Sequence, residues 1–274
     1  MIDVAEHIAV MDSFKKLTWK RIQRRRDSFE NKYMAIFRRI LNKQYSILAD
    51  SIDVTNYRDL ELPDKKIDSE PIEWGMIELY KGVGATFAQE SFNGLKSGMP
   101  GILRKEEELI DTWYQQMISH VKTAAGAKIV SITEESRRQA IKIIKQVLEE
   151  GVDLGANETA TLIKKALIKN GTIINQWRSL RIARTEIVAA SNFGSMQGAL
   201  ATGLPMVKEW LPTYDSRTRD THMAVAAQNP KEMNEMFQVG AYLMQYPGSP
   251  EGGAEEVINC RCGIVHRVKE INIL

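Results

Sequence analysis

The first 50 residues carry an uninterrupted helical pattern, and this feature constrains the fold more than any other. From Val4 to Ala49, apolar residues recur at the spacing of one helix face, and neither proline nor glycine occurs. At 1.5 Å per residue such a helix would be roughly 65 Å long, which is too long for a compact domain without a break or a partner. The sequence therefore predicts a long helical arm over residues 1–50.

The same arm is strongly basic, although the whole chain has a formal net charge of only +2. Between Lys15 and Lys43 there are eleven Lys and Arg residues and only two acidic ones. Such an excess favours salt-dependent contact with DNA. Two other uses of the arm stay open, namely partner binding or self-association, and a solvated face on a helical bundle. The candidate DNA contacts are Lys15, Lys16, Lys20, Arg21, Arg24, Arg25 and Arg26.

The composition is that of a globular protein, with 43% hydrophobic and 26% charged residues over a length that allows two structural units. No apolar run approaches the roughly 18–20 residues that span a bilayer, so no membrane signal is expected. The segment Met1–Val10 lacks the pattern of a secretory signal. Two cysteines two positions apart do not form a disulfide framework, and they favour synthesis in a reducing compartment.

The middle of the chain, residues 51–171, predicts a helical region. A capping-box sequence, Ser131–Glu134, indicates a helix that begins there and ends near Gly151. Asn170 and Gly171 are expected to end a later helix. A breaker is expected at 97–101. The other expected helices cover Glu73–Leu95, Lys105–Ala124 and Glu158–Lys169.

Beyond Gly171 the pattern changes to that of a small α+β domain, residues 172–274. A long helix rich in small residues is expected over Ile174–Ala201, and strands over Val207–Pro212 and Ile258–Arg267. The predicted fold class is α+β and mostly α. Long N-terminal helices and a helical bundle are followed by a small C-terminal α+β domain with a short sheet.

Cys260 and Cys262 form a candidate metal site. On a strand, alternate residues share a face, so Cys260, Cys262 and His266 would point the same way. Two thiols can share one tetrahedral zinc, with His222 supplying a nitrogen and His266 or Asp215 the fourth ligand. Zinc is thus the candidate cofactor, in a structural role. Two other interpretations stay open, since buried cysteines often act as small hydrophobic residues and a Cys–His pair can be nucleophilic.

Several shorter motifs accompany the cysteines. Arg184 and Glu186 lie two positions apart in a predicted helix, so we expect them to face different partners. Asp215 suits the N-cap of a helix that would carry Arg219 and His222 on one face. The segment Tyr246–Pro250 predicts a rigid turn.

Taken in order, these pieces resemble the Mu F-like phage head morphogenesis domain, over roughly Ile174–Val268. They are Ala-Arg-Thr-Glu (183–186), Asn192, Gly198, Lys-Glu-Trp (208–210), Asp215-x-Arg217-Thr-Arg219-x-x-His222, Tyr-Pro-Gly-Ser-Pro (246–250) and Asn-Cys-Arg-Cys (259–262). Ser249 stands where an acidic residue is expected, which weakens any cation site in that turn. The motif residues that the resemblance singles out are Arg184, Glu186, Asn192, Trp210, Asp215, Arg217, Arg219 and Asn259.

The resemblance implies a phage minor capsid protein of the virion, made in the host cytoplasm. Its implied partners are the portal protein and capsid or scaffold proteins. It would act in the head interior during procapsid assembly and DNA packaging, retention or ejection, without catalytic residues. Some relatives carry a toxin domain after this unit, and none is expected here because the sequence ends at Leu274. The alternative function is a metal- or thiol-dependent hydrolase that uses His222, Cys260 and Cys262.

Overall fold

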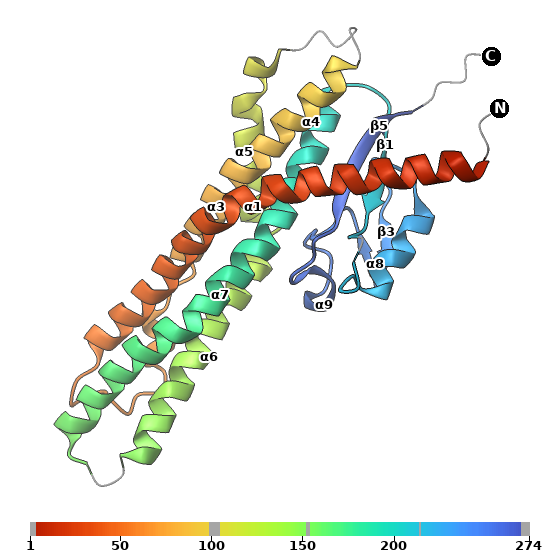
Figure 1. Ribbon diagram of the computed structural model, residues 1–274. Coiled ribbons are helices and arrows are strands. Elements are labelled where there is room, and N and C mark those ends of the chain that lie inside the picture. Colours follow the sequence, from red (N-terminus) through yellow and green to blue (C-terminus); the bar gives the residue numbers. More distant parts are fainter. Residues whose placement is uncertain (1–3, 99–104, 152–153, 214, 270–274) are drawn as a thin grey trace. The chain divides into compact units, whose positions relative to one another are not determined.

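A computed structural model describes residues 4–98, 105–151, 154–213 and 215–269 (Figure 1). The fold is α+β and mostly α, which confirms the expected class. The helices are α1 (Val4–Ser51), α2 (Leu62–Lys66), α3 (Glu70–Leu79), α4 (Ala85–Ser97), α5 (Ile110–Thr123), α6 (Gly126–Glu150), α7 (Ala156–Ala201), α8 (Asp220–Val225) and α9 (Ala254–Val257). The π-helical turn η1 (Tyr80–Gly84) joins α3 to α4, and short 3₁₀ turns are η2 (Glu106–Glu108) and η3 (Ala226–Gln228).

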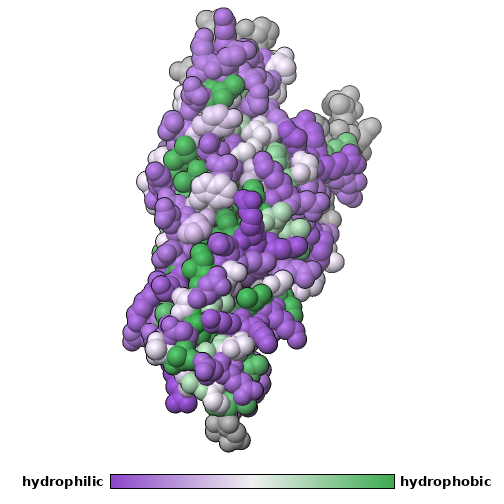
Figure 2. Space-filling model, turned by 90° about the vertical axis from the view of Figure 1, so that its left-hand side faces the viewer, coloured by the Kyte–Doolittle hydropathy of each residue, from purple (hydrophilic) through white to green (hydrophobic). Residues whose placement is uncertain are grey.

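The chain forms two compact units, and each is assembled from segments far apart in sequence. Unit 1 comprises residues 1–31, 79–120 and 184–274, and unit 2 comprises residues 32–78 and 121–183. This division differs from the three consecutive domains expected at 1–50, 51–171 and 172–274, because α1 and α7 each contribute residues to both units. The face shown in Figure 2 is mainly hydrophilic, with apolar side chains in small separate groups. No helix among the described residues is long and apolar enough to cross a membrane.

Unit 2 is helical, and its core corrects two predicted helix ends. Gly171 does not end a helix but lies inside α7, where a Cβ would meet the Tyr45 ring at 2.6 Å. The absence of a side chain there allows close packing, which outweighs the low helix propensity of glycine. Ser131 is likewise interior, because α6 already begins at Gly126. The core around Tyr45 includes Leu48, Ile52, Ile67, Ile143, Ile144, Ile163 and Leu167.

Unit 1 holds the strands. They are β1 (Met206–Leu211), β2 (Lys231–Glu232), β3 (Phe237–Val239), β4 (Tyr242–Met244) and β5 (Gly263–Val268). An antiparallel sheet has the order β2-β1-β5, and β3 pairs with β4. The strand expected at Val207–Pro212 is β1. The strand expected at Ile258–Arg267 is only β5, because Asn259 has a left-handed φ of 55° and the chain is a loop up to Cys262.

The two helices expected at Glu73–Leu95 and Lys105–Ala124 are present with somewhat different bounds. The helix expected at Glu73–Leu95 is the nearly continuous run of α3, η1 and α4, and the helix expected at Lys105–Ala124 is mainly α5. Part of the expected breaker, residues 99–101, lies outside the described residues.

Within unit 1, α7 packs backbone-to-backbone against η1 and α4. Gly194 faces the carbonyl oxygen of Gly84, and Gly198 faces that of Ala88. A Cβ at either glycine would overlap these oxygen atoms, so only glycine permits this approach. The spacing of four residues on both helices keeps the small residues on one face.

Replacing Gly194 with alanine should therefore destabilise the protein by at least about 1–3 kcal/mol, because backbone must move to admit the methyl group. Gly94→Ala is the matched control, since Gly94 lies within α4 and a Cβ there meets nothing within 4 Å. Helix propensity predicts that this control is stabilising by up to about 1 kcal/mol. Urea unfolding of both variants measures the difference, and equal effects would contradict the close packing.

Candidate metal centre

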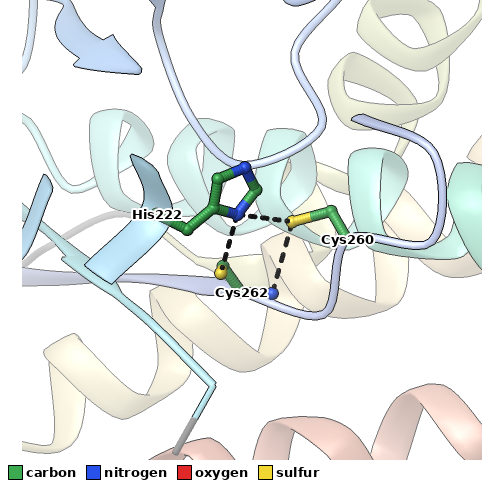
Figure 3. Close-up of side chains that lie close together, drawn as sticks. All are labelled: His222, Cys260 and Cys262. Atoms are coloured by element: carbon green, nitrogen blue, oxygen red, sulfur yellow. Dashed lines mark hydrogen bonds between the residues drawn. The ribbon is translucent and has the colours of Figure 1, made fainter. Parts of the chain in front are cut away.

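His222, Cys260 and Cys262 come together in unit 1 as a buried cluster (Figure 3). His222 lies on α8, and the cysteines lie in the loop between α9 and β5, here called the cysteine loop (258–262). His222 Nδ1 is 3.3 Å from Cys262 Sγ and 3.7 Å from Cys260 Sγ. Each of the three residues is at most 2% exposed. One imidazole nitrogen and two thiols are thus close enough together to hold a metal ion.

Glu256 fixes the orientation of the imidazole. His222 Nε2 is 3.0 Å from Glu256 Oε2, and the Thr221 hydroxyl donates to the same oxygen at 2.9 Å. With the proton on Nε2, the imidazole donates a hydrogen bond to the carboxylate, and the lone pair of Nδ1 faces the two thiols. A carboxylate behind the distal nitrogen is the usual support of a metal-bound histidine. Trp210 packs its ring edge-on to His222, with the centroids 5.5 Å apart.

The left-handed turn at Asn259 shapes the cysteine loop. The Asn259 backbone N–H donates to Thr185 Oγ1 of α7 at 3.1 Å. The Cys262 N–H then turns inward toward Cys260 Sγ at 3.4 Å. Asparagine tolerates this backbone conformation better than most residues, which explains its place before the first cysteine. The turn brings both sulfur atoms to the same side of the loop.

Asn192 of α7 forms hydrogen bonds to the end of the cysteine loop. Its amide nitrogen donates to the carbonyl oxygens of Cys262, at 3.2 Å, and of Pro247, at 2.8 Å. Its side-chain oxygen accepts from the Ile264 N–H at 3.1 Å. One buried amide therefore connects α7 to the first residues of β5 and to the turn at 246–250.

Arg26 of α1 supplies the second anchor. Its guanidinium donates to Asn192 Oδ1 at 2.7 Å, to Ser191 Oγ at 2.8 Å and to the carbonyl oxygens of Arg261 and Cys262. Arg26 is only 2% exposed, and burial lowers its pKa to about 10, against the opposing effect of the two thiols. Arg26 is therefore not an exposed DNA contact, which corrects the expectation for this one residue.

The two thiols differ in acidity because they interact. The hydrogen bond with Cys260 lowers the pKa of Cys262, and His222 lowers that pKa further. The same bond raises the pKa of Cys260. A thiolate at Cys262 is thus stabilised by its immediate neighbours, and a thiolate is the form that binds a metal.

Two of the five predicted ligands lie elsewhere. Asp215 is exposed and pairs with Arg261, with one N–O distance of 2.7 Å, and this partner holds the pKa of Asp215 far below its usual range. His266 is on β5, 3.4 Å from Ser195 Oγ, and burial lowers its pKa to about 3. The expectation that His266 shares a face with both cysteines fails because the cysteines precede the strand.

The remaining motif residues mostly make structural contacts within unit 1. Arg184 forms a two-bond ion pair with Glu30 at 2.7 and 2.9 Å. Glu186 is buried and accepts a hydrogen bond from the Tyr80 hydroxyl at 3.2 Å. Arg219 donates to the Ile258 carbonyl oxygen at 2.7 Å. Arg217, which is exposed, lies 3.5 Å from Asp215.

Sequence reasoning did not identify Glu256, Thr221 and Thr185 as supports of the centre. Glu256 is one of two adjacent glutamates, and its neighbour Glu255 instead accepts from the Tyr242 hydroxyl at 2.6 Å. Nothing in the local sequence distinguishes the two carboxylates. The signal that marks Glu256 is its position opposite His222, which exists only in the folded chain.

Comparison with known proteins identifies the region that contains the centre. A family model described as "Phage Mu protein F like protein" matches residues 142–265. The chain is also similar to NAD(+)--arginine ADP-ribosyltransferase EFV of Enterococcus faecalis, with 32% identity over 98 residues. That match covers 35% of this chain and 20% of the relative, so the chain matches about a fifth of the relative's length. No solved structure matches the chain.

Arg26→Ala should destabilise the protein by roughly 2–5 kcal/mol, because it strips buried acceptors of their donor. Arg24→Ala is the matched control on the same helix, since Arg24 is exposed and should change stability by no more than about 0.5 kcal/mol. Urea unfolding gives both free energies. If the two variants were equally stable, Arg26 would not anchor the cysteine loop.

Proposed function

We propose that this protein is a minor capsid protein with a structural role in phage head morphogenesis, because residues 142–265 match the family model described as "Phage Mu protein F like protein". The observation that carries the proposal is the agreement between the matched region and the buried centre. The match contains the two cysteines, His222 and their supports Glu256 and Asn192. The likeness therefore includes the residues that organise a folded unit, beyond the helical pattern alone.

We further propose that the protein acts in the virion, at the head interior, with the portal protein and with capsid or scaffold proteins as partners. In this setting it would serve procapsid assembly and DNA packaging, retention or ejection. An apolar face of α7 in unit 2 suits a protein partner. Leu162, Ile173 and Trp177 share that face by their spacing, and Trp177 is 70% exposed.

Burial favours a structural role over the alternative of a hydrolase. A nucleophilic thiol or a catalytic metal needs access to substrate. His222, Cys260 and Cys262 are each at most 2% exposed, and the cavity that all three line, about 10 Å³, is too small for a peptide or a nucleotide. The enterococcal relative is named as a transferase, but about four-fifths of that protein lies outside the matched segment.

Quantitative mass spectrometry of purified virions and proheads tests the role in the head. We expect this protein in both, at a copy number comparable to that of the portal subunits and far below that of the major capsid protein. Its absence from both particles would contradict a minor capsid protein and would favour a factor that acts outside the head.

We propose that the metal of the centre is zinc and that it clamps the cysteine loop to α8. With Zn–S bonds of about 2.3 Å and a Zn–N bond of about 2.0–2.1 Å, tetrahedral geometry separates nitrogen from sulfur by about 3.6 Å. The distances from His222 Nδ1 to the two sulfur atoms, 3.3 and 3.7 Å, fit this value. His222, Cys260 and Cys262 would be the ligands, and zinc binding would release the thiol protons.

Metal analysis of variants tests the clamp. Cys260→Ser and His222→Ala should lose stoichiometric zinc and lower the melting temperature. Glu256→Gln should keep the ligands but weaken zinc affinity by about 10- to 100-fold, because it removes the charge behind the imidazole. Glu255→Gln is the control on the same short helix, and it should bind zinc as the parent does. Unchanged metal content and stability in the first two variants would contradict the proposed zinc clamp.

We also propose that one face of α1 contacts packaged DNA. Of the candidate basic residues, Lys16, Lys20, Arg21 and Arg24 are exposed, whereas Lys15 pairs with Glu209 and Arg25 with Glu90. Another face of the same helix is held to unit 1, where Trp19 Nε1 donates to the Arg261 carbonyl oxygen at 3.1 Å. The supported contact set is thus four residues rather than seven.

A salt titration of DNA binding tests this face in the full-length protein. Each phosphate contact contributes about 0.9 to the slope of log affinity against log salt, so changing the four residues to glutamine should lower the slope by up to about 4. The control replaces four exposed lysines of unit 2, namely Lys142, Lys145, Lys165 and Lys169. Equal slopes in the two variants would show that the α1 face makes no DNA contact.

A further inference from the structure

The cluster supplies three of the four ligands that a tetrahedral zinc requires. Among the residues that the structure describes, the group of metal-binding side chains comprises His222, Cys260 and Cys262 alone. We propose that the fourth position is exchangeable and takes a water molecule or a small anion. This inference rests on the proposed zinc centre, and it extends the centre by a ligand-binding site.

A small cavity lies beside the three metal-binding side chains. It has a volume of about 10 Å³, and its lining includes all three metal-binding residues. A cavity needs about 10–15 Å³ to hold one water molecule. The space therefore fits a single solvent molecule or an ion of similar size, and it excludes a peptide or a nucleotide.

Thr213 brings a buried polar group to the lining of this cavity. Thr213 is 1% exposed and lines the small cavity. Its hydroxyl is buried without a hydrogen-bond partner among the described residues. The Thr213 backbone hydrogen-bonds to Cys262, and its carbonyl oxygen accepts from the Thr218 hydroxyl at 2.5 Å. These backbone contacts hold the hydroxyl beside the centre. Buried polar groups are nearly always paired, and a metal-bound water or anion would supply the partner.

The surrounding charge favours an anion. Zinc with two thiolates and a neutral imidazole is formally neutral, whereas Arg217, Arg219 and Arg261 all line the small cavity. Arg261 is neutralised in part by Asp215, and Arg219 is fixed by the Ile258 carbonyl oxygen. Asp215 also lies 3.5 Å from Arg217, and Glu256 lies 3.0 Å from His222. Three guanidinium groups against these two carboxylates leave an excess of positive charge near the cavity, which favours hydroxide or a small monoanion.

A larger cavity offers an approach from solvent. It has a volume of about 670 Å³ and shares Arg217, Arg219, Asn259, Cys260 and Arg261 with the small one. A ligand that reaches these shared residues is next to the centre. Exchange at the fourth position would proceed past these shared residues, although the three protein ligands are buried.

Cobalt substitution tests the inference in the full-length protein. Co²⁺ takes the tetrahedral zinc position, and its visible absorption reports the ligand set. We expect one Co²⁺ per chain and a saturable spectral change when azide is added. Thr213→Val should weaken azide binding by roughly 5-fold, the loss of about one hydrogen bond, whereas Thr213→Ser should bind azide as the parent does.

The outcomes separate this inference from the proposals on which it rests. A cobalt spectrum that ignores azide, at one Co²⁺ per chain, would overturn the exchangeable position and leave the zinc clamp intact. Failure to bind either metal would overturn both. Equal azide affinities of the valine and serine variants would show that the Thr213 hydroxyl does not contact the bound anion. The presence of the protein in virions is measured independently of all three results.

Discussion

The buried guanidinium of Arg26 is the interaction on which the organisation of unit 1 depends. It joins α1 to α7 through Ser191 and Asn192, and it joins α1 to the cysteine loop through the carbonyl oxygens of Arg261 and Cys262. A buried cation is unfavourable unless its donors are satisfied. These four acceptors can be offered together only when the helices and the loop are assembled, so the cation makes their assembly interdependent.

The geometry of the candidate metal centre follows from this arrangement. Because Arg26 and Asn192 hold the Cys262 carbonyl from one side, the sulfur atoms turn to the other, toward His222. Glu256 then sets the imidazole so that Nδ1 faces them. A zinc ion at this point would link α8 to a loop that already contacts α1 and α7.

The helical pattern and the ordered motifs identified the fold class and the three clustered residues, because both signals are local or follow from residue chemistry. Long-range packing decided the rest. Gly171 has the sequence signature of a helix end, yet the Tyr45 ring keeps it inside α7. Arg24, Arg25 and Arg26 are indistinguishable in sequence, and only the third is buried. The carboxylate of Asp215 could bind a metal, but in the folded chain it forms an ion pair with Arg261.

X-ray absorption spectroscopy at the zinc edge, on the purified full-length protein, measures which atoms bind the metal and at what distances. We expect two sulfur atoms at about 2.3 Å, one imidazole nitrogen at about 2.0–2.1 Å and one further light atom. Four sulfur ligands would mean that cysteines of two chains share the metal. A shell of light atoms alone, or no bound zinc, would contradict a metal centre built on His222, Cys260 and Cys262.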